Sequence, residues 1–264
     1  MSHLRITLVQ ADLAWEDPDA NRAYFDHVLA SAKDAADLVV LPEMFTTGFT
    51  MAGDACAETM DGPSVRWLRS KAVELKADVA GSLIIRDEGQ LYNRLVWATA
   101  GGALYFYDKR HLFRMSGEHH VYGAGSTQLT VKIGAWRIRP FICYDLRFPI
   151  WTRNIGQAYD MAFFVANWPA ARAAHWKTLL QARAIENQSY VVGVNRVGRD
   201  GNGHAYAGDS MVLDPQGTVL FHAQDREVIH TLALDAASQE AYRKKFPAWR
   251  DADTVSMGGA SVVE

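Results

Sequence analysis

Glu43, Lys109 and Cys143 hold equivalent positions in the sequence, because each directly follows a run of residues that is typical of a strand. Glu43 follows LVVLP, Lys109 follows ALYFYD and Cys143 follows RIRPFI. In layered α/β folds, ligands bind at strand ends and in the loops that follow them. A carboxylate, an ammonium group and a thiol at three strand ends therefore predict a catalytic set.

The three side chains suit nucleophilic attack on an amide. A cysteine attacks a carbonyl carbon as the thiolate, yet a free cysteine is mostly protonated near neutral pH. Cys143 therefore needs a base, which Glu43 can provide, and a positive neighbour, which Lys109 can provide. Lys109 and the backbone N–H of Tyr144 could stabilise the oxyanion, and losing one such donor typically costs about 3–4 kcal/mol. The set predicts a cysteine amidohydrolase that cleaves a small carbon–nitrogen bond.

Glu118 is a fourth candidate, because no other acidic residue lies between Lys109 and Cys143. It belongs to the segment MSGEHHVY, within a long loop that we expect over residues 110–126. A second carboxylate there could orient Lys109 or assist proton transfer to the leaving ammonia.

Each of these residues also has an ordinary structural interpretation. A cysteine after a strand is often a small buried hydrophobic residue. Glu43 could cap the segment that follows it, Lys109 could be a solvated surface charge, and Glu118 could be one more polar loop residue. Cys56 lies in a polar stretch with no base or oxyanion donor nearby in sequence, so we expect no catalytic role for it.

Competing catalytic motifs find little support. The chain has no G-x-S-x-G motif of a serine hydrolase. The segment GRDGNG at 198–203 has the wrong glycine order for a dinucleotide-binding loop and is interpreted as a turn. His111, His119 and His120 match neither an H-E-x-x-H motif nor a zinc-finger spacing. We therefore expect no metal site.

The elements that must position these residues alternate between strands and helices. Apolar spacing predicts helices that begin at Pro18 and Pro63, and further helices around 149–157, 172–187 and 236–245. Strands are expected at 5–9, 38–41, 79–85, 92–99, 103–107, 128–133, 136–142, 160–166, 189–195, 206–213, 217–222 and 228–234, with an irregular tail after the last helix. The pattern indicates a mixed sheet covered by helices in one domain over 1–264, and it leaves open whether there are one or two sheets.

Composition and charge narrow the classes of partner. The chain has 264 residues, of which 49% are hydrophobic, and its net charge is −3. The charges are scattered, so no nucleic-acid partner is expected. No apolar run approaches the roughly 18 residues of a membrane helix, and the arginine in MSHLRITLVQ argues against a signal peptide. The two cysteines suggest no disulfide framework, so we expect a cytoplasmic protein.

Three segments carry a resemblance to a known family. LPEMF at 41–45, YDKRHLF at 107–113 and CYDLRFP at 143–149 resemble, in order and spacing, the signature segments of the nitrilase or carbon–nitrogen hydrolase superfamily. The resemblance runs from LVQADLAW through ARAIENQ to GDSMVLDPQG. It implies a four-layer α-β-β-α sandwich that forms a homodimer or higher homo-oligomer, with the tail of about 246–264 in a dimer contact. It also implies that Glu43 is the base, Lys109 the oxyanion stabiliser, Cys143 the nucleophile and Glu118 the second glutamate. It further implies that no metal and no organic cofactor takes part.

Within this superfamily the chain is most similar to the omega-amidase branch, through CYDLRFP, NWP at 167–169, HW at 175–176 and KFPAW. That branch deamidates small 2-oxo dicarboxylic acid monoamides such as 2-oxoglutaramate, a step linked to glutamine transamination and methionine salvage. The segment NWPAAR differs from the longer loop of the animal enzymes in this branch. The alternatives are another amidase, a carbamoylase or a nitrilase of the superfamily, a metal-dependent amidase, and a catalytically silent binding protein.

A dicarboxylic monoamide requires a cation at the end of the pocket opposite its amide. Arg147 follows the nucleophile by four residues, so a helical turn would bring it over the same face. Its guanidinium can bind a carboxylate through two parallel hydrogen bonds, although a structural ion pair with a nearby acid is the alternative. Arg172 and Arg196 are weaker candidates. Asn167 and Trp168 are expected to contact the substrate, with Trp168 as an apolar wall.

Overall fold

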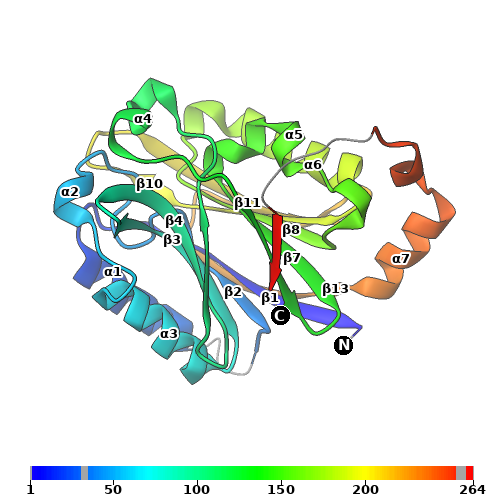
Figure 1. The fold of residues 1–264 in the computed structure, drawn as a ribbon, viewed down its shortest axis with the longest axis horizontal. Helices are drawn as coiled ribbons and strands as arrows, with labels where there is room; N and C mark the ends of the chain where they lie inside the picture. The colour runs from blue at the N-terminus through cyan, green and yellow to red at the C-terminus, as the bar shows by residue number, and fades with distance from the viewer. Residues whose placement is uncertain (1, 31–34, 254–259, 264) are drawn as a thin grey trace.

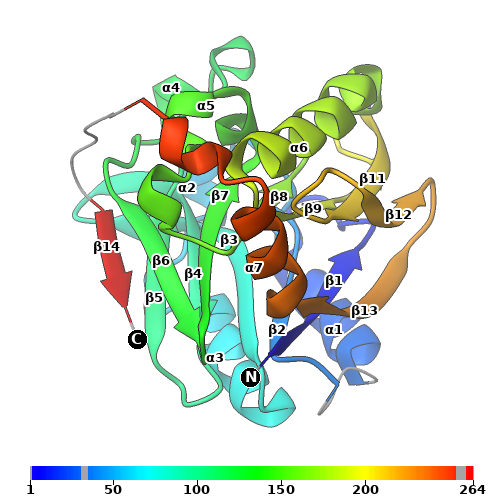
Figure 2. The same cartoon turned by 90° about the vertical axis from the view of Figure 1, so that its right-hand side faces the viewer.

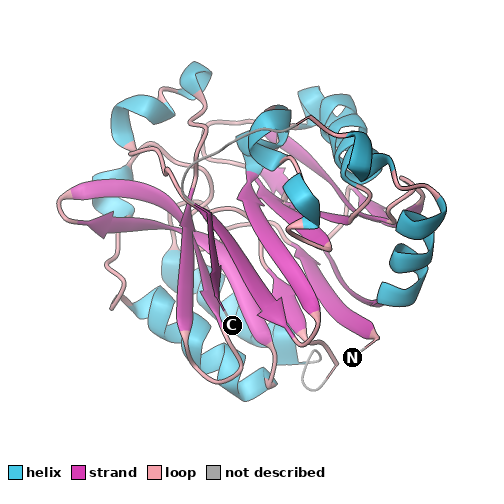
Figure 3. Cartoon of the chain, turned by 45° about the vertical axis from the view of Figure 1, so that its right-hand side comes forward, coloured by secondary structure: helices cyan, strands magenta, loops and turns pink. Residues whose placement is uncertain are grey.

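Two sheets pack face to face in the computed structural model, which describes residues 2–30, 35–253 and 260–263. The first sheet has the strand order β13-β1-β2-β3-β4-β5 and the second the order β10-β11-β9-β8-β7-β6-β14, with β12 paired to β11. Helices lie outside both sheets, so the chain forms a four-layer α-β-β-α sandwich (Figures 1 and 3). The expected fold class is confirmed. The sequence left the number of sheets open, and the structure has two.

The strands that the sequence predicted lie close to their expected bounds, and β10 and β14 were not predicted. In the first sheet they are β1 (His3–Gln10), β2 (Leu38–Val40), β3 (Asp78–Asp87), β4 (Gln90–Ala98), β5 (Leu104–Asp108) and β13 (Val228–Asp235). In the second they are β6 (Gln128–Ile133), β7 (Trp136–Ile142), β8 (Met161–Ala166), β9 (Tyr190–Asn195), β10 (Val197–Arg199), β11 (Ala205–Leu213), β12 (Val219–Gln224) and β14 (Ala260–Val263).

Alternation along each strand explains why the first sheet buries both of its faces. In β1, Ile6 and Leu8 pack into the core between the sheets, whereas Val9 packs under α1 (Pro18–Leu29) and α3 (Pro63–Leu75). Side chains alternate between the two faces of a strand, so one strand can serve two apolar layers. On the second sheet, α5 (Pro149–Thr152), α6 (Ala173–Asn187) and α7 (Ala236–Lys245) lie on the outer side (Figure 2).

Two helix starts follow sequence rules for helix capping. The carboxylate of Asp17 accepts the N–H of Ala20 before α1, and both α1 and α3 have proline in the first turn. Proline is tolerated there because the first N–H groups have no partner inside the helix. Among the described residues, no helix has the length and apolarity that crossing a bilayer requires.

Three expectations about local structure are wrong in part. The helix expected around 149–157 ends at Thr152, because Arg153 adopts an extended conformation, and η4 (Ile155–Gln157) follows separately. The loop expected at 110–126 contains η2 (Arg114–Ser116) and α4 (Glu118–Val121), so Glu118 begins a helical turn. The tail after α7 contains η6 (Ala248–Asp251) and β14, which pairs in parallel with β6, while residues 254–259 and 264 lie outside the described part.

The fold brings several strand ends to one end of the sandwich. β5 is antiparallel to β4, which is antiparallel to β3, so β5 runs parallel to β2 and β3. β7 and β8 are parallel neighbours in the second sheet. The residues after β2, β5, β7 and β8 therefore come together across the two sheets, as the cavity that they line shows.

Candidate active site

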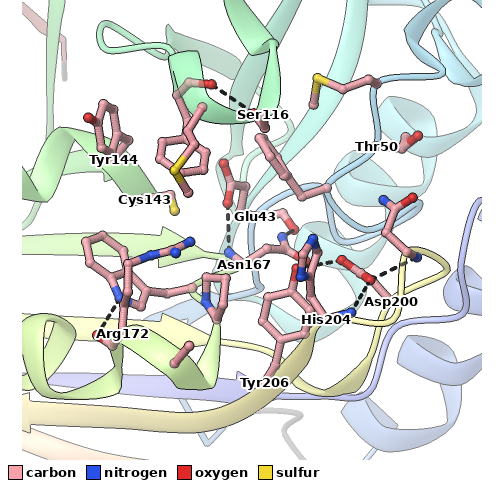
Figure 4. Close-up of a pocket in the computed structure, with 18 of the residues that line it drawn as sticks. Glu43, Thr50, Ser116, Cys143, Tyr144, Asn167, Arg172, Asp200, His204 and Tyr206 are labelled. Carbon is pink, nitrogen blue, oxygen red and sulfur yellow. Dashed lines mark hydrogen bonds between the residues drawn. The ribbon is translucent and has the colours of Figure 1, made fainter.

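A cavity of about 640 Å³ opens where these strand ends meet (Figure 4). Glu43, Lys109 and Cys143 all line it, together with Tyr144 and Asn167. Figure 4 places the thiol of Cys143 beside Glu43. The residues predicted from their positions after strands are thus brought together in one cavity.

Cys143 lies at a sharp turn between β7 and η3 (Cys143–Arg147) and has a φ of 43°. A residue other than glycine rarely adopts this left-handed conformation, and such strain persists only where the surroundings hold the backbone. Buried Asp145 provides that support: it accepts the N–H of Ile142 at 3.1 Å and the N–H of His111 at 2.9 Å. Tyr107 also donates its hydroxyl to Asp145 at 2.7 Å. The turn that carries Cys143 is therefore tied to the segment that follows Lys109.

Lys109 lies between two buried carboxylates. Its Nζ donates to Oε1 of Glu43 at 2.9 Å and to both oxygens of Glu118, at 2.9 and 3.1 Å. All three side chains are almost completely buried. A buried charge is tolerated only when it is paired and hydrogen-bonded, and this cluster meets both conditions. The structural interpretation of Lys109 as a solvated surface charge is wrong.

The charges of this cluster determine how Cys143 ionises. Burial alone would lower the pKa of Lys109, but the carboxylates of Glu118 and Glu43 raise it on balance, so the ammonium stays protonated. Burial raises the pKa of Glu118, against the opposite effect of Lys109. Burial, followed by the charge of Glu43, raises the pKa of the Cys143 thiol well above its usual value, although Lys109 lowers it. The raised pKa favours the neutral thiol, so ionisation of Cys143 calls for a base such as the neighbouring Glu43.

Two asparagines fix the orientation of Glu43. Asn93, in the middle of β4, donates its side-chain amide to Oε1 of Glu43 at 2.8 Å. Asn167, directly after β8, donates its backbone N–H to Oε2 at 2.7 Å and its side-chain amide to the Glu43 carbonyl at 2.6 Å. Sequence reasoning missed Asn93, and it assigned Asn167 to the substrate. Asn93 stands beside the charged Arg94 in the run NRLVWA, so nothing in the sequence distinguished it.

Arg147 also lines the cavity, but through a different turn from the one expected. η3 is a 3₁₀ helix rather than an α-helical turn. The guanidinium lies 4.6 Å from the ring of Trp168 and within 3.2 Å of Nδ1 of His175. Within the described part of the chain, no carboxylate forms an ion pair with Arg147, so the alternative of a structural ion pair has no support there.

The two weaker arginine candidates differ in position. Arg172 lines the cavity, with its guanidinium 5.5 Å from the ring of Phe113. Arg196 does not line it: the side chain is fully buried and donates to Asp12 at 2.7 Å and to the Leu13 carbonyl at 3.2 Å. Arg196 therefore has a structural role.

The histidines considered as metal ligands do not line the cavity. His111 is within 2.8 Å of Asp145 through Nδ1 and stacks on Phe148 at 3.7 Å. His119 and His120 pack against one another on α4. Across residues 2–30, 35–253 and 260–263, no three His, Cys, Asp or Glu side chains gather as ligands of a metal ion.

Comparison with known proteins identifies the family of this chain. The family model of carbon-nitrogen hydrolases matches residues 5–244. The chain belongs to the carbon-nitrogen hydrolase family. The resemblance found in the three sequence segments is thereby confirmed.

Relatives of this carbon-nitrogen hydrolase share nearly its full length. It is 49% identical over 254 residues to the omega-amidase YafV of Escherichia coli strain K12, an alignment that covers 96% of this chain and 98% of the relative. It is 34% identical to a 2-oxoglutaramate amidase of Bacillus subtilis strain 168, over 93% of this chain and 96% of the other. The crystal structure of XC1258 from Xanthomonas campestris, a CN-hydrolase superfamily protein, superposes with a TM-score of 0.95 at 48% identity and covers 98% of this chain and 100% of that one.

Proposed function

We propose that this carbon-nitrogen hydrolase is an omega-amidase that converts small 2-oxo dicarboxylic acid monoamides, such as 2-oxoglutaramate, to the 2-oxo acid and ammonia. One observation carries the proposal. The Cys143 thiol, which lies beside the buried Glu43–Lys109 ion pair, shares its cavity with Arg147, and no carboxylate of the described residues forms an ion pair with Arg147. The identity to omega-amidase YafV and to 2-oxoglutaramate amidase supports the substrate class.

In the first half of the proposed reaction, Cys143 attacks the amide carbon while Glu43 takes the thiol proton. The raised pKa of Cys143 makes this proton transfer necessary at neutral pH. The tetrahedral oxyanion is stabilised by the Lys109 ammonium and by the backbone N–H of Tyr144, in the first turn of η3, where N–H groups have no partner inside the helix. The intermediate collapses as the carbon–nitrogen bond breaks, the nitrogen takes the proton from Glu43, and ammonia leaves a thioester on Cys143.

In the second half, water hydrolyses the thioester. Glu43 takes a proton from the water, the water oxygen bonds to the carbonyl carbon, and the carbon–sulfur bond breaks. The proton returns to the sulfur, so the acid product leaves a neutral thiol. Since Asn93 and Asn167 hold Glu43 in place through both steps, the same base serves both.

Glu118 has a positioning role in this proposal. It accepts two hydrogen bonds from Lys109 and also the backbone N–H of Phe113. These contacts fix the ammonium beside the oxyanion position and balance its charge, so that Glu43 remains available as a base.

Arg147 is the proposed anchor of the distal carboxylate. Its guanidinium rests on Trp168 and has donors to spare, and arginine binds carboxylates through two parallel hydrogen bonds. Trp168 contributes an apolar wall. Asn167, which we expected to contact the substrate, acts in this proposal chiefly through Glu43, although its Oδ1 accepts no hydrogen bond from the described residues.

An ammonia-release screen tests the proposed function. The substrates are 2-oxoglutaramate, L-glutamine, a nitrile and a carbamoyl compound, each measured with and without a chelator. We expect 2-oxoglutaramate to be the best substrate and the chelator to have no effect. A preference for the nitrile or carbamoyl compound, activity that the chelator abolishes, or no turnover of any amide would contradict the proposal.

The setting of the enzyme is a further part of the proposal. We propose that the chain acts as a single domain over 1–264 and as a homodimer or higher homo-oligomer in the cytoplasm, where its reaction serves methionine salvage. Exposed apolar residues at α5 and in the segment after α7 support a contact between copies: Ile150, Phe246 and Trp249. Sedimentation analysis of the purified protein tests the oligomeric state.

A further inference from the structure

Two arginines share one wall of the active-site cavity. Arg147 lies over the ring of Trp168, and the indole N–H of Trp168 donates to the Arg172 carbonyl at 2.8 Å. On the other side, the Arg172 guanidinium faces Phe113, whose ring is 5.0 Å from that of Tyr144. The Tyr144 ring in turn lies 6.0 Å from the Arg147 guanidinium. Aromatic residues therefore join the Arg147 guanidinium to the Arg172 backbone on one side and to the Arg172 guanidinium on the other.

Neither guanidinium is neutralised by a carboxylate within the described residues. The acidic residues that line the cavity are engaged elsewhere. Glu43 accepts hydrogen bonds from Lys109, Asn93 and Asn167. Asp200 accepts the Tyr206 hydroxyl and the backbone N–H groups of Asn202 and His204. Glu16 accepts the Thr50 hydroxyl. Glu43 pairs with Lys109, and neither Asp200 nor Glu16 forms an ion pair with Arg147 or Arg172 among the described residues. The wall is therefore locally positive, so it attracts anions and opposes a second cation.

We propose that Arg172 determines the preference of the enzyme for 2-oxo acid amides over 2-amino acid amides. The inference rests on the proposed omega-amidase function and deepens it. Arg147 binds the distal carboxylate, and Arg172 faces the neighbouring carbon of the substrate. A 2-oxo oxygen accepts hydrogen bonds and is stabilised by this second guanidinium, whereas an ammonium group on the same carbon is repelled by it.

The chemistry of the two substrates makes this position decisive. 2-Oxoglutaramate and L-glutamine present the same amide to Cys143 and the same carboxylate to Arg147, and they differ at the carbon next to that carboxylate. Anchoring the carboxylate therefore brings the differing group close to the anchor. Since specificity is a difference between two affinities, an unfavourable charge contact with the wrong substrate is as effective as a favourable contact with the right one.

The test compares three substrates that differ only at this carbon: 2-oxoglutaramate, glutaramate and L-glutamine, which carry an oxo group, a methylene and an ammonium. Ammonia release gives kcat and KM for the wild type and for Arg172→Gln, which removes the charge. Arg172→Lys retains the charge. Arg69→Gln removes one positive charge from the exposed surface of α3, away from the cavity, and is the matched control.

We expect Arg172→Gln to lower the ratio of kcat/KM for 2-oxoglutaramate over L-glutamine by about tenfold, mainly through KM, because like charges no longer meet. Glutaramate should change little, Arg172→Lys should keep most of the ratio, and Arg69→Gln should leave it unchanged. An unchanged ratio in folded Arg172→Gln, or equal losses on all three substrates, overturns this inference alone. A wild type that does not hydrolyse 2-oxoglutaramate overturns the proposed function instead.

Discussion

Asn167 binds Glu43 at two points: its backbone N–H donates to the carboxylate at 2.7 Å, and its side-chain amide donates to the Glu43 carbonyl at 2.6 Å. The first contact orients the carboxylate and the second fixes the backbone that carries it. With Lys109 and Asn93 on the other oxygen, the carboxylate has little freedom to rotate. In the proposed mechanism, a base held in this way loses little entropy when it receives the thiol proton.

Asn167→Ala tests whether this residue positions the base or contacts the substrate. The substitution removes the side-chain hydrogen bond and leaves the backbone N–H in place. We expect kcat to fall about tenfold, the equivalent of about 1.4 kcal/mol, with little change in KM. Steady-state kinetics on 2-oxoglutaramate measures both. A rise in KM at constant kcat would instead return Asn167 to the substrate contacts predicted from the sequence.

Cys143→Ala should abolish turnover in a folded protein. Removal of a nucleophile that acts as a unit with its base lowers kcat by at least about a thousandfold. The control is Cys56→Ala, which should leave turnover largely intact because Cys56 does not line the cavity. Ammonia release and circular dichroism on both variants measure this. Activity near the wild-type level in folded Cys143→Ala would contradict the proposed mechanism.

The raised pKa of Cys143 predicts how the thiol reacts in the free enzyme. Alkylation by iodoacetamide should keep increasing as the pH rises past neutrality, with no plateau near pH 7, because burial and Glu43 keep the thiol protonated. Glu43→Gln removes one negative neighbour, so its alkylation profile should move to lower pH even though amide turnover is lost. A plateau below neutral pH in the wild type would show that a thiolate is present before substrate binds.

The raised pKa of Cys143 also makes the free energy of unfolding depend on pH. The folded pKa of Cys143 lies above that of an unfolded thiol. The contribution of this group is therefore fully present below the unfolded pKa and is lost as the pH rises through the folded pKa. Urea denaturation at neutral and at strongly alkaline pH measures this effect. The free energy of unfolding should fall less between the two pH values in Cys143→Ala than in the wild type.

The sequence predicted the parts of the site that depend on strand ends. Glu43, Lys109 and Cys143 each follow a strand, and the topology of the two sheets brings those ends together. It could not predict Asn93, because a polar residue inside β4 reaches Glu43 only once the turn after β2 has folded beside it. The sequence also did not predict that α5 ends before Arg153, since position 153 is neither proline nor glycine.

Glu118 should be needed both for stability and for activity. Glu118→Ala leaves Lys109 with one fewer buried carboxylate, and breaking a buried ion pair costs roughly 3–5 kcal/mol of unfolding free energy. Glu118→Gln keeps an acceptor oxygen for Lys109, so it should recover much of the stability but little of the activity. Urea denaturation and kcat on both variants measure the two effects. Full activity in Glu118→Gln would limit Glu118 to packing.

Arg147→Lys should weaken the binding of substrates that carry a distal carboxylate. Lysine retains the charge but cannot form two parallel hydrogen bonds, and it lacks the planar group that the guanidinium places 4.6 Å from the Trp168 ring. Each lost hydrogen bond to a charged group is worth about 1.5–3 kcal/mol, so kcat/KM for 2-oxoglutaramate should fall at least about tenfold. A neutral amide of similar size should be affected much less, because it presents no carboxylate to this end of the cavity. Equal losses on both substrates, or a loss that unfolding explains, would exclude Arg147 as the anchor and leave the adjacent Arg172 as the cation that receives the carboxylate.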